Sequence, residues 1–574
     1  MKVLYKYIHG YEKESILAPL FKLLEVVFDL MVPLVVAKII DVGIVNSDTG
    51  YIVKMFIALI VMALLGLASS ITAQFFAAKA SVGFATKLRQ ALFDHIQSFS
   101  FTELDTLKTD TLITRLTDDV NQVQNGYNMA LRLLLRSPFV VLGSMIMAFT
   151  INVQCALVFV VAIPILFVVV FTIMIVSIPL FKKVQSALDK ITGLTRENLT
   201  GVRVIRAFCQ EENSIEQFDN QNEYLTKMNL FVGRISALLN PLTYVLINIA
   251  TIILIQKAGL QVNIGNMQQG EVVALYNYMA QMIVELIKLA SLIITLNKAM
   301  ACADRVSSVL KVETSMKYEE KEEKTLDSTV VSFKNVSFTY AGAATSSLEN
   351  ISFDVLPGQT IGIIGPTGSG KSTLVRLIAR FYDATHGEIF VSGKNVKDYS
   401  KKSLMDKIGY VFQRSVLFQG SIRDNLMLGN ETATDEELWK ALELAQAKEV
   451  VESKKGQLDF ELEQGGRNLS GGQKQRLTIA RALVKKPEIL ILDDSASALD
   501  FATDAKLRQA IRTLKGYTTT FLVSQRTASI KQSDLILVMD DGKLVGKGSH
   551  DELMETCSVY QEIYYSQFPK KEVA

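Results

Sequence analysis

A glycine-rich segment in the second half of the sequence has the composition of a phosphate-binding loop. It follows the short apolar run 360–364 and precedes apolar residues at helical spacing, so a strand, a loop and a helix occur in the order that such a site requires. Glycines let backbone N–H groups close around a phosphate, and the amino end of the helix adds positive potential. The residues predicted to surround ATP in this loop are Gly365, Pro366, Thr367, Gly368, Ser369, Gly370, Lys371, Ser372 and Thr373.

Three side chains around this loop predict how Mg²⁺ and the phosphates are held. We expect Lys371 to bridge the β- and γ-phosphates and the Ser372 hydroxyl to ligate Mg²⁺. The apolar run 489–492 ends in Asp493, and a carboxylate at the end of a buried strand is a second group suited to Mg²⁺. The sequence thus predicts ATP and Mg²⁺ as the cofactors of this half of the chain.

A second pattern suited to anions lies between the loop and Asp493. Ser470 precedes two glycines at the start of a predicted helix, where backbone N–H groups can bind a phosphate. Since one nucleotide seldom needs two such sites in one chain, the simplest arrangement is a dimer in which this segment caps the ATP of the partner. An N-capped helix without a ligand is the alternative for this pattern alone. The segment consists of Leu469, Ser470, Gly471, Gly472 and Gln473.

The first half of the chain has the composition of a membrane protein. Of the 574 residues, 49% are hydrophobic, and the mean hydropathy is +0.26, which is rare for a soluble chain of this length. A bilayer core about 30 Å thick requires about 20 residues of helix. The candidate spans lie near 16–40, 52–78, 131–151, 155–181, 236–260 and 271–299. These runs predict an all-α transmembrane domain with six spans.

The predicted domain boundaries follow from a change in composition. The charged, aperiodic stretch 312–329 predicts a linker between a transmembrane domain at 1–311 and a nucleotide-binding domain at 330–574. In the second domain, short apolar runs alternate with helical patterns, which predicts an α/β P-loop fold with a parallel sheet. The connections after the second and fourth spans are long and keep a helical periodicity. We therefore expect the membrane helices to extend well into the cytoplasm.

Basic residues orient the predicted spans. Lys and Arg are concentrated in the N-terminal segment and in the second and fourth connections, whereas the first, third and fifth contain none and Lys257 borders the fifth. We therefore expect both termini in the cytoplasm and the chain in the cytoplasmic membrane. A net charge of +2 gives no support to a nucleic acid partner. The four cysteines and four histidines form no pattern typical of a metal site.

Charged side chains within the predicted spans are candidate functional residues, because an ionisable group that faces lipid is costly. Glu25 and Asp29 share one helix face, and they either line a substrate cavity or make structural hydrogen bonds to neighbouring helices. Glu285 and Lys288 also share a face and are predicted to form a local ion pair, with Glu285 a further candidate for the cavity. Asp41 lies at the outer end of the first span.

Together, the two phosphate-binding patterns, Asp493 and the six spans resemble an ABC exporter half-transporter, in which one six-helix membrane domain is fused to one nucleotide-binding domain. The resemblance covers nearly the whole chain, and its motifs are specific. It implies that the segment 469–473 is the signature that acts on the ATP of a partner. It also implies that Tyr340 stacks on adenine, and that Gln413 of the Q-loop binds Mg²⁺ and senses the membrane domain.

The same resemblance assigns further segments. Thr111–Val120 and Phe208–Phe218 resemble the cytoplasmic loops of the family, which carry the coupling helices that press on the nucleotide-binding domains. Asp41 matches the place of acids that form an external gate in related exporters. The D-loop is matched by Ser497, Ala498, Leu499 and Asp500.

Two residues depart from the family pattern at the catalytic centre. The residue after the Walker B aspartate Asp493 is normally Glu, the general base for hydrolysis, and here it is Asp494, whose side chain is one methylene shorter. Gln525 stands where the family has His; its amide can donate a hydrogen bond to a γ-phosphate but cannot carry a proton. Loss of a positioned base typically costs about 10²–10⁴-fold in rate.

These departures resemble the degenerate-site subunit of bacterial heterodimeric multidrug ABC exporters. That resemblance implies a second half-transporter with intact Glu and His as partner, and hydrolysis at the composite site that the partner completes. It also implies ATP-driven export of hydrophobic or cationic amphipathic compounds across a lipid membrane. The alternatives are an active homodimer that tolerates both changes, a peptide or lipid exporter, and a nucleotide-gated channel or regulator with little turnover.

Overall fold

The computed structural model describes residues 2–318, 329–495 and 499–568 and divides into two compact units. One unit comprises Met1–Gln97 and Asp110–Val312, and the other comprises Ser98–Thr109 and Glu313–Ala574. Part of the predicted linker, together with Ser497 and Ala498 of the predicted D-loop, lies outside the described residues.

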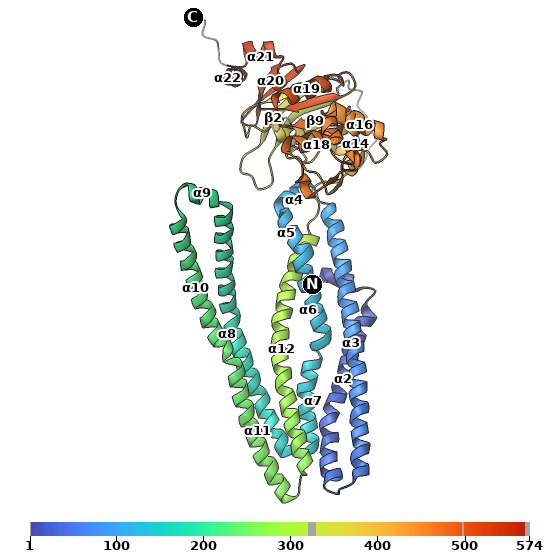
Figure 1. The fold of residues 1–574 in the computed structure, drawn as a ribbon, viewed down its shortest axis with the longest axis vertical. Helices are drawn as coiled ribbons and strands as arrows, with labels where there is room; N and C mark the ends of the chain where they lie inside the picture. Colours follow the sequence, from blue (N-terminus) through green and yellow to red (C-terminus); the bar gives the residue numbers. More distant parts are fainter. Residues whose placement is uncertain (1, 319–328, 496–498, 569–574) are drawn as a thin grey trace. The chain divides into compact units, whose positions relative to one another are not determined.

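The first unit is built from helices (Figure 1). Its long helices are α2 Glu12–Lys38, α3 Thr49–Gln97, α6 Val120–Leu133, α7 Arg136–Ile151, α8 Val153–Thr200, α10 Glu211–Ala237, α11 Leu239–Ile264 and α12 Gln269–Leu310. Its short helices and turns are α1 Lys2–Tyr5, the 3₁₀ turn Lys6–Ile8, the π-helical turns Ile39–Ile44 and Arg115–Asp119, α5 Thr109–Thr114 and α9 Val202–Ala207.

Five helical segments of the described chain are long and apolar enough to cross a membrane. They are Thr49–Gln97, Thr109–Ile151, Val153–Thr200, Glu211–Ile264 and Gln269–Leu310. The remaining predicted span corresponds to α2, whose apolar run is interrupted by Lys22, Glu25 and Asp29. By composition alone the unit therefore has five clear spans and one charged candidate.

Several helices are far longer than a membrane is thick. α3 has 49 residues and α8 has 48, so at about 1.5 Å per residue each is about 72 Å or more in length, whereas the hydrocarbon core measures about 30 Å. This confirms the predicted extension of the helices beyond the membrane. α8 contains Pro164 and Pro179, and it continues without another proline from Pro179 to its end at Thr200.

The core of the helical unit gathers around α12. Tyr278 and Met279 of α12 are buried in one hydrophobic cluster with Val26 of α2, Phe159 of α8 and Leu254 of α11. The Tyr278 hydroxyl donates a hydrogen bond of 2.6 Å to the backbone carbonyl of Leu30 in α2. Buried apolar surface and this polar contact together hold α2 and α12 side by side.

The second unit contains a six-stranded sheet in the order β12-β11-β3-β10-β9-β6. Its strands are β3 Thr360–Ile364, β6 Ile408–Val411, β9 Ile489–Asp493, β10 Thr519–Val523, β11 Leu535–Asp540 and β12 Lys543–Gly548. All neighbouring pairs are parallel except β11 with β12. Parallel strands are covered on both faces, which explains why the sequence of each reads as a continuous apolar run.

Further elements surround this sheet. The second sheet has the order β2-β1-β4-β5, with strands β1 Val331–Phe338, β2 Leu348–Val355, β4 His386–Val391 and β5 Lys394–Asn395. The helices used below are α13 Lys371–Ile378, α14 Lys401–Lys407, α16 Asp435–Leu444, α18 Gly471–Val484, α19 Phe501–Arg512, α20 Thr527–Ile530 and α22 Ser558–Gln567. The predicted strands at 360–364 and 489–493 are β3 and β9, which confirms the predicted α/β P-loop fold.

α4, residues Phe101–Leu107, belongs to the second unit. The ring of Phe101 stacks on that of Phe381, with ring centroids 4.6 Å apart. The hydroxyl of Tyr382 donates a hydrogen bond of 2.6 Å to Asp105. An aromatic contact and a hydrogen bond thus fix this short helix to the residues that follow α13.

The segments that resemble the family's cytoplasmic loops adopt two different structures. Thr111–Val120 forms α5, a π-helical turn and the start of α6, and α4 precedes it, so the helix that packs on the second unit lies earlier in the sequence than this segment. Phe208–Phe218 covers the turn after α9 and the first part of α10, and the Phe208 side chain is exposed. The assignment of these two segments as cytoplasmic loops stays a prediction, and it did not include α4.

Candidate nucleotide site

The phosphate loop connects β3 to α13 and depends on its glycines. Gly365, Gly368 and Gly370 all have positive φ angles, and Gly370 is the N-cap of α13 in the left-handed conformation. A Cβ at Gly370 would lie 2.7 Å from the backbone carbonyl oxygen of Ser347. Any other residue would therefore be strained and crowded there. The loop has the backbone that phosphate binding requires.

Lys371 lies inside this loop. Its amino group donates hydrogen bonds of 2.8 Å to the carbonyl of Gly365 and 2.6 Å to that of Pro366. Burial lowers the pKa of Lys371, and Asp494 and Asp493 oppose that shift. An arriving phosphate can exchange for the two carbonyl oxygens as the partner of the ammonium group, so the predicted role of Lys371 fits the geometry.

The residues predicted to hold Mg²⁺ come together at the carboxyl end of β9. The Ser372 hydroxyl donates a hydrogen bond of 2.7 Å to one carboxylate oxygen of Asp493, and the Tyr410 hydroxyl donates one of 3.1 Å to the other. A hydroxyl and a carboxylate are oxygen ligands of the type that Mg²⁺ takes. The donor set fits the ion.

Tyr410 was not predicted from the sequence. It lies on β6 beside β9, and burial raises its pKa, so the phenol stays protonated and donates to Asp493. Its place in a strand three residues before Gln413 was the available signal, but a tyrosine in an apolar strand is far more often a core residue.

Asp494 lies next to Gln413. The Gln413 amide donates a hydrogen bond of 3.2 Å to the Asp494 carboxylate. Asp494 has a φ of 48°, and its backbone N–H donates to the carbonyl of Val523 at the end of β10. Burial is the main cause that raises the pKa of Asp494, and the hydrogen bond from Gln413 opposes it. The two side chains thus share one edge of the sheet.

Gln525 lies in the turn between β10 and α20, with an exposed side chain. The amide of Gln567, on α22, donates a hydrogen bond of 2.7 Å to the backbone carbonyl of Gln525. The carbonyl oxygen of the same Gln567 amide accepts a hydrogen bond of 2.8 Å from the Thr527 N–H. One side chain from the last described helix therefore spans this turn. Sequence patterns could not reveal a contact between residues so far apart.

Tyr340 lies beside the amino end of α13. Its hydroxyl is 3.1 Å from that of Thr373, and its ring makes edge contacts with Phe338 at 4.8 Å and Tyr382 at 5.2 Å between centroids. Tyr382 is also the residue that hydrogen-bonds Asp105 of α4. The predicted adenine-stacking residue is thus part of an aromatic cluster next to the phosphate loop.

The signature segment begins α18. Ser470 is the N-cap, its hydroxyl accepts a hydrogen bond of 3.4 Å from the Gln473 N–H, and the Gln473 side chain accepts one of 3.0 Å from the Ser470 N–H. A Cβ at Gly471 would meet nothing within 4 Å. Leu469 is buried, which anchors the segment. The amino end of a 14-residue helix is therefore presented on an open surface.

The described part of the D-loop leads into α19. Leu499 is buried, and the side chain of Asp500 accepts a hydrogen bond of 2.9 Å from the Thr503 N–H. This backbone hydrogen bond is the main cause that lowers the pKa of Asp500. In this chain Asp500 caps a helix, and its predicted D-loop role remains a prediction.

Charged residues of α2, α7 and α12 form one network. Arg136 at the start of α7 lies 3.6 Å from Glu25, 3.2 Å from Asp29 and 3.9 Å from Glu285. Lys288 pairs with Glu285 at 2.8 Å, which confirms the predicted local ion pair. Sequence analysis missed Arg136 because its partners lie on other helices.

Glu25 and Glu285 each make one further contact. Lys22 lies 2.5 Å from Glu25, and the Ser137 hydroxyl donates a hydrogen bond of 2.9 Å to Glu285. Asp29 is the accessible member, with 45% of its side chain exposed, compared with 12% for Glu25. Basic side chains of the same unit therefore compensate most of the charge of these acids. Such compensation is expected because an unpaired ion inside a membrane is costly.

Asp41 does not belong to that network. Its carboxylate accepts a hydrogen bond of 2.5 Å from the N–H of Gly270, the second residue of α12. A carboxylate at the amino end of a helix is favourable because the first N–H groups have no partner within the helix. Asp41 therefore ties the π-helical turn after α2 to the start of α12, and its role in a gate stays a prediction.

The sequences of the helical unit and of the nucleotide-binding unit both match known protein families. Residues 15–286 match the family described as the ABC transporter transmembrane region, and residues 348–497 match the family described as ABC transporter. The uncharacterized ABC transporter ATP-binding protein YfiB of Bacillus subtilis is 36% identical over 97% of this chain and 96% of its own. A second uncharacterized ABC transporter ATP-binding protein, MT1311 of Mycobacterium tuberculosis, is 36% identical over 99% of this chain and 98% of its own.

A solved structure has the same fold. The structure of a bacterial Atm1-family ABC exporter with ATP bound is similar with a TM-score of 0.79 at 22% identity, over 98% of this chain and 99% of that one. The chain belongs to the ABC transporters, as a half-transporter in which a membrane region is fused to an ATP-binding domain. It is a subunit of an ATP-hydrolysing membrane transporter.

Proposed function

We propose that the chain is one half of a heterodimeric exporter whose own ATP site turns over slowly. The observation that carries this proposal is the pair Asp494 and Gln525 at the two positions where the family has Glu and His. The Asp494 side chain is one methylene shorter and already accepts a hydrogen bond from Gln413. The shorter side chain reduces its reach toward the attacking water, which a general base must approach within hydrogen-bond distance.

Each group at the site has a role in this proposal. Lys371 and the loop N–H groups bind the phosphates of ATP. Ser372, Gln413 and Asp493 would hold Mg²⁺, which neutralises charge between the phosphates. The Gln525 amide donates to the γ-phosphate but moves no proton. ATP at this site is therefore held in place and hydrolysed slowly.

The signature segment works for the other site. Ser470 and the N–H groups at the start of α18 face outward and would cap the ATP bound to the partner chain. The partner supplies Glu and His to that composite site, where hydrolysis is fast. Closure of the two ATP-binding domains would be passed to the membrane helices through coupling segments such as α4. The distribution of Lys and Arg supports a location in the cytoplasmic membrane with both termini inside.

Purification tests this assignment directly. The full-length chain, purified without a second half-transporter, should hydrolyse ATP slowly or not at all, and co-purification with its partner should restore turnover. Lys371→Ala in the chain alone controls for contaminating ATPases. Robust turnover by the chain alone, abolished by this substitution, would show an active homodimer and sink the proposal.

We further propose that the cargo includes lipophilic cations, which Asp29 would contact through its exposed carboxylate. Inside-out vesicles should accumulate a cationic dye against its gradient when ATP is added, whereas a nucleotide-gated channel would only equilibrate the dye. The double substitution Glu25→Gln with Asp29→Asn should reduce export of cationic dyes more than that of neutral ones. An equal effect on both dyes would assign the two acids a structural role with Arg136 instead.

A further inference from the structure

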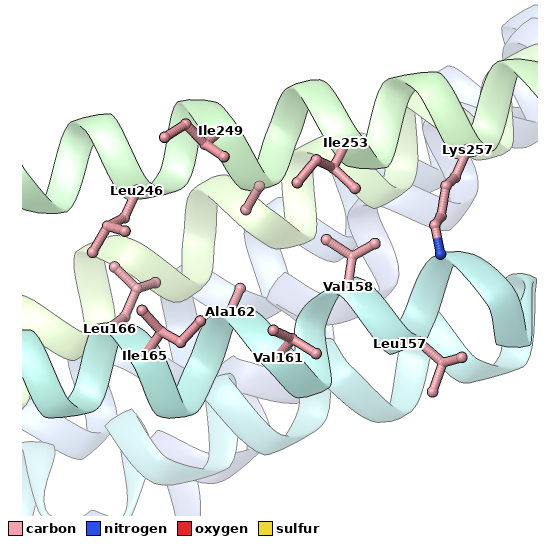
Figure 2. A pocket seen from close by; sticks show the side chains of 11 residues that line it. Leu157, Val158, Val161, Ala162, Ile165, Leu166, Leu246, Ile249, Ile253 and Lys257 are labelled. Carbon is pink, nitrogen blue, oxygen red and sulfur yellow. The ribbon is translucent and has the colours of Figure 1, made fainter.

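A groove between α8 and α11 has a volume of about 280 Å³ and is lined by apolar side chains and one lysine (Figure 2). Val161 and Ile165 of α8 and Ile249 and Ile253 of α11 line it and are exposed, with Val161 at 61%. Lys257 lies at one end, and its amino group points across the groove toward α8 (Figure 2). The groove is thus an apolar channel with a single cation at its mouth.

The length of the groove matches one leaflet of a bilayer. Its lining runs from Leu157 to Leu166 on α8 and from Leu246 to Lys257 on α11. At about 1.5 Å per residue these stretches measure about 14 Å and about 17 Å. Half of a hydrocarbon core of about 30 Å is about 15 Å. One extended acyl chain would therefore fill the groove from its mouth to the middle of the membrane.

Polar side chains just beyond Lys257 mark the edge of the hydrocarbon region. The Gln261 amide donates a hydrogen bond of 2.8 Å to the side chain of Gln154 near the start of α8. The Asn266 amide donates one of 3.2 Å to Gln261. Lys257 lies one helical turn from this polar layer, on its apolar side. Lys257 therefore lies within about 6 Å along the helix axis of the inferred edge of the hydrocarbon region.

Among the residues that the structure describes, none forms a hydrogen bond or ion pair with the Lys257 side chain. By contrast, Lys22 and Lys288 in the same unit each pair with an acid. The amino end of α8 at Val153 adds further positive potential on this side. An unpaired ammonium group at the hydrocarbon edge is costly, and a lipid phosphate within reach would compensate it.

We propose that this groove binds an anionic phospholipid of the outer leaflet, with one acyl chain along α8 and α11 and its phosphate paired with Lys257. We assign the outer leaflet because the two connections at this end of the groove, residues 152–154 and 258–270, contain no Lys or Arg. An anionic headgroup is preferred because it brings no internal cation to compete with Lys257 for the phosphate. The assignment is independent of which ATP site is catalytic.

Quenching of an introduced tryptophan tests the occupant. The chain has one tryptophan, Trp439 of α16 in the ATP-binding unit, so Val161→Trp places a second reporter in the groove. The full-length chain, with any half-transporter that co-purifies, is reconstituted with brominated phosphatidylglycerol or brominated phosphatidylcholine of matched acyl chains. Phosphatidylglycerol should quench the groove indole at a several-fold lower mole fraction.

Substitutions of Lys257 test whether this residue recognises the lipid headgroup. In the Val161→Trp background, Lys257→Gln should abolish the difference between the two lipids, and Lys257→Arg should keep it. Lys54→Gln, on the exposed surface of α3, is the matched control and should change nothing. A preference that survives Lys257→Gln overturns the proposal. So does an indole that neither lipid quenches, because a protein segment such as a partner helix then covers the groove.

Discussion

The two predicted anion-binding segments of the ATP-binding unit differ in how closely other residues of the same chain surround them. At the phosphate loop, a Cβ on Gly365 would overlap the carbonyl oxygen of Met539, and one on Gly370 would crowd Ser347. At the signature segment, the same addition at Gly471 meets nothing within 4 Å. The loop is packed inside its own domain, whereas the signature presents open backbone.

From this difference we expect the phosphate loop to be complete within one chain and the signature segment to need a second chain. The phosphate loop holds Lys371 between two backbone carbonyls of its own domain. The signature has a helix amino end and a capping hydroxyl, and the surface above them is open. Changes at the loop should therefore act on the binding of ATP by this chain, and changes at the signature should act on the turnover of the assembled pair.

The largest effect is expected from Gly471→Glu. A bulky anion at the amino end of α18 would repel the γ-phosphate of the partner's ATP and block closure, so the ATPase rate of the pair should fall by about 100-fold or more. Lys440→Glu on the exposed face of α16 is the control, because it also introduces an acidic side chain but away from the signature, and it should retain most of the activity. Normal turnover of the Gly471→Glu variant would remove the signature from the active site.

Lys371→Ala should have the next largest effect, on binding and not on assembly. Loss of a charge-assisted contact of about 1.5–3 kcal/mol weakens ATP binding by about 10- to 150-fold. The measurement is ATP affinity of the chain itself, with Lys402→Ala on the exposed face of α14 as control. Unchanged affinity in the Lys371 variant would mean that the loop is not where this chain binds ATP.

Asp494→Asn should do much less to the pair. The asparagine side chain can still accept the hydrogen bond from Gln413, and in the proposed heterodimer this site mainly binds ATP. The loss in turnover should stay well below the about 100-fold that removal of a working base causes. If Asp494→Asn is as inactive as Gly471→Glu, this chain's own site is the catalytic one.

The smallest effect is expected at Gln567. Gln567→Ala removes two hydrogen bonds from the turn that carries Gln525. Local opening should become easier by about 1 kcal/mol, which corresponds to about fivefold faster hydrogen exchange at the Thr527 amide. Gln567→Glu keeps the acceptor for that amide and should preserve most of its protection. Equal exchange in the wild type and in the Ala variant would mean that α22 does not support the turn.

The elements that could be predicted from sequence are those with a local signal. β3 and β9 are buried on both faces, so their apolar runs give their limits, and the loop between β3 and α13 follows a fixed motif. The ion pair of Glu285 and Lys288 was predictable because both lie on one helix face. Each of these signals is contained in a few consecutive residues.

The residues that were missed have partners far away in sequence. Arg136 is a single basic residue at the start of a span, and only the packing of α2, α7 and α12 reveals that it faces three acids. Tyr410 and Gln567 have ordinary sequence surroundings, and their functions depend on a neighbouring strand or turn. Helical and strand periodicity predicts a buried face but not which residue lies opposite.

The two prolines of α8 determine where this long helix can bend. Each proline removes one backbone hydrogen bond, so kinks concentrate at such positions. Between Pro179 and Thr200 the helix continues for about 32 Å without another proline. A kink of about 20° at Pro179 would swing the far end by about 11 Å. Because Pro179 lies near one end of the predicted membrane span, a small change of angle there would move α9 over a large distance.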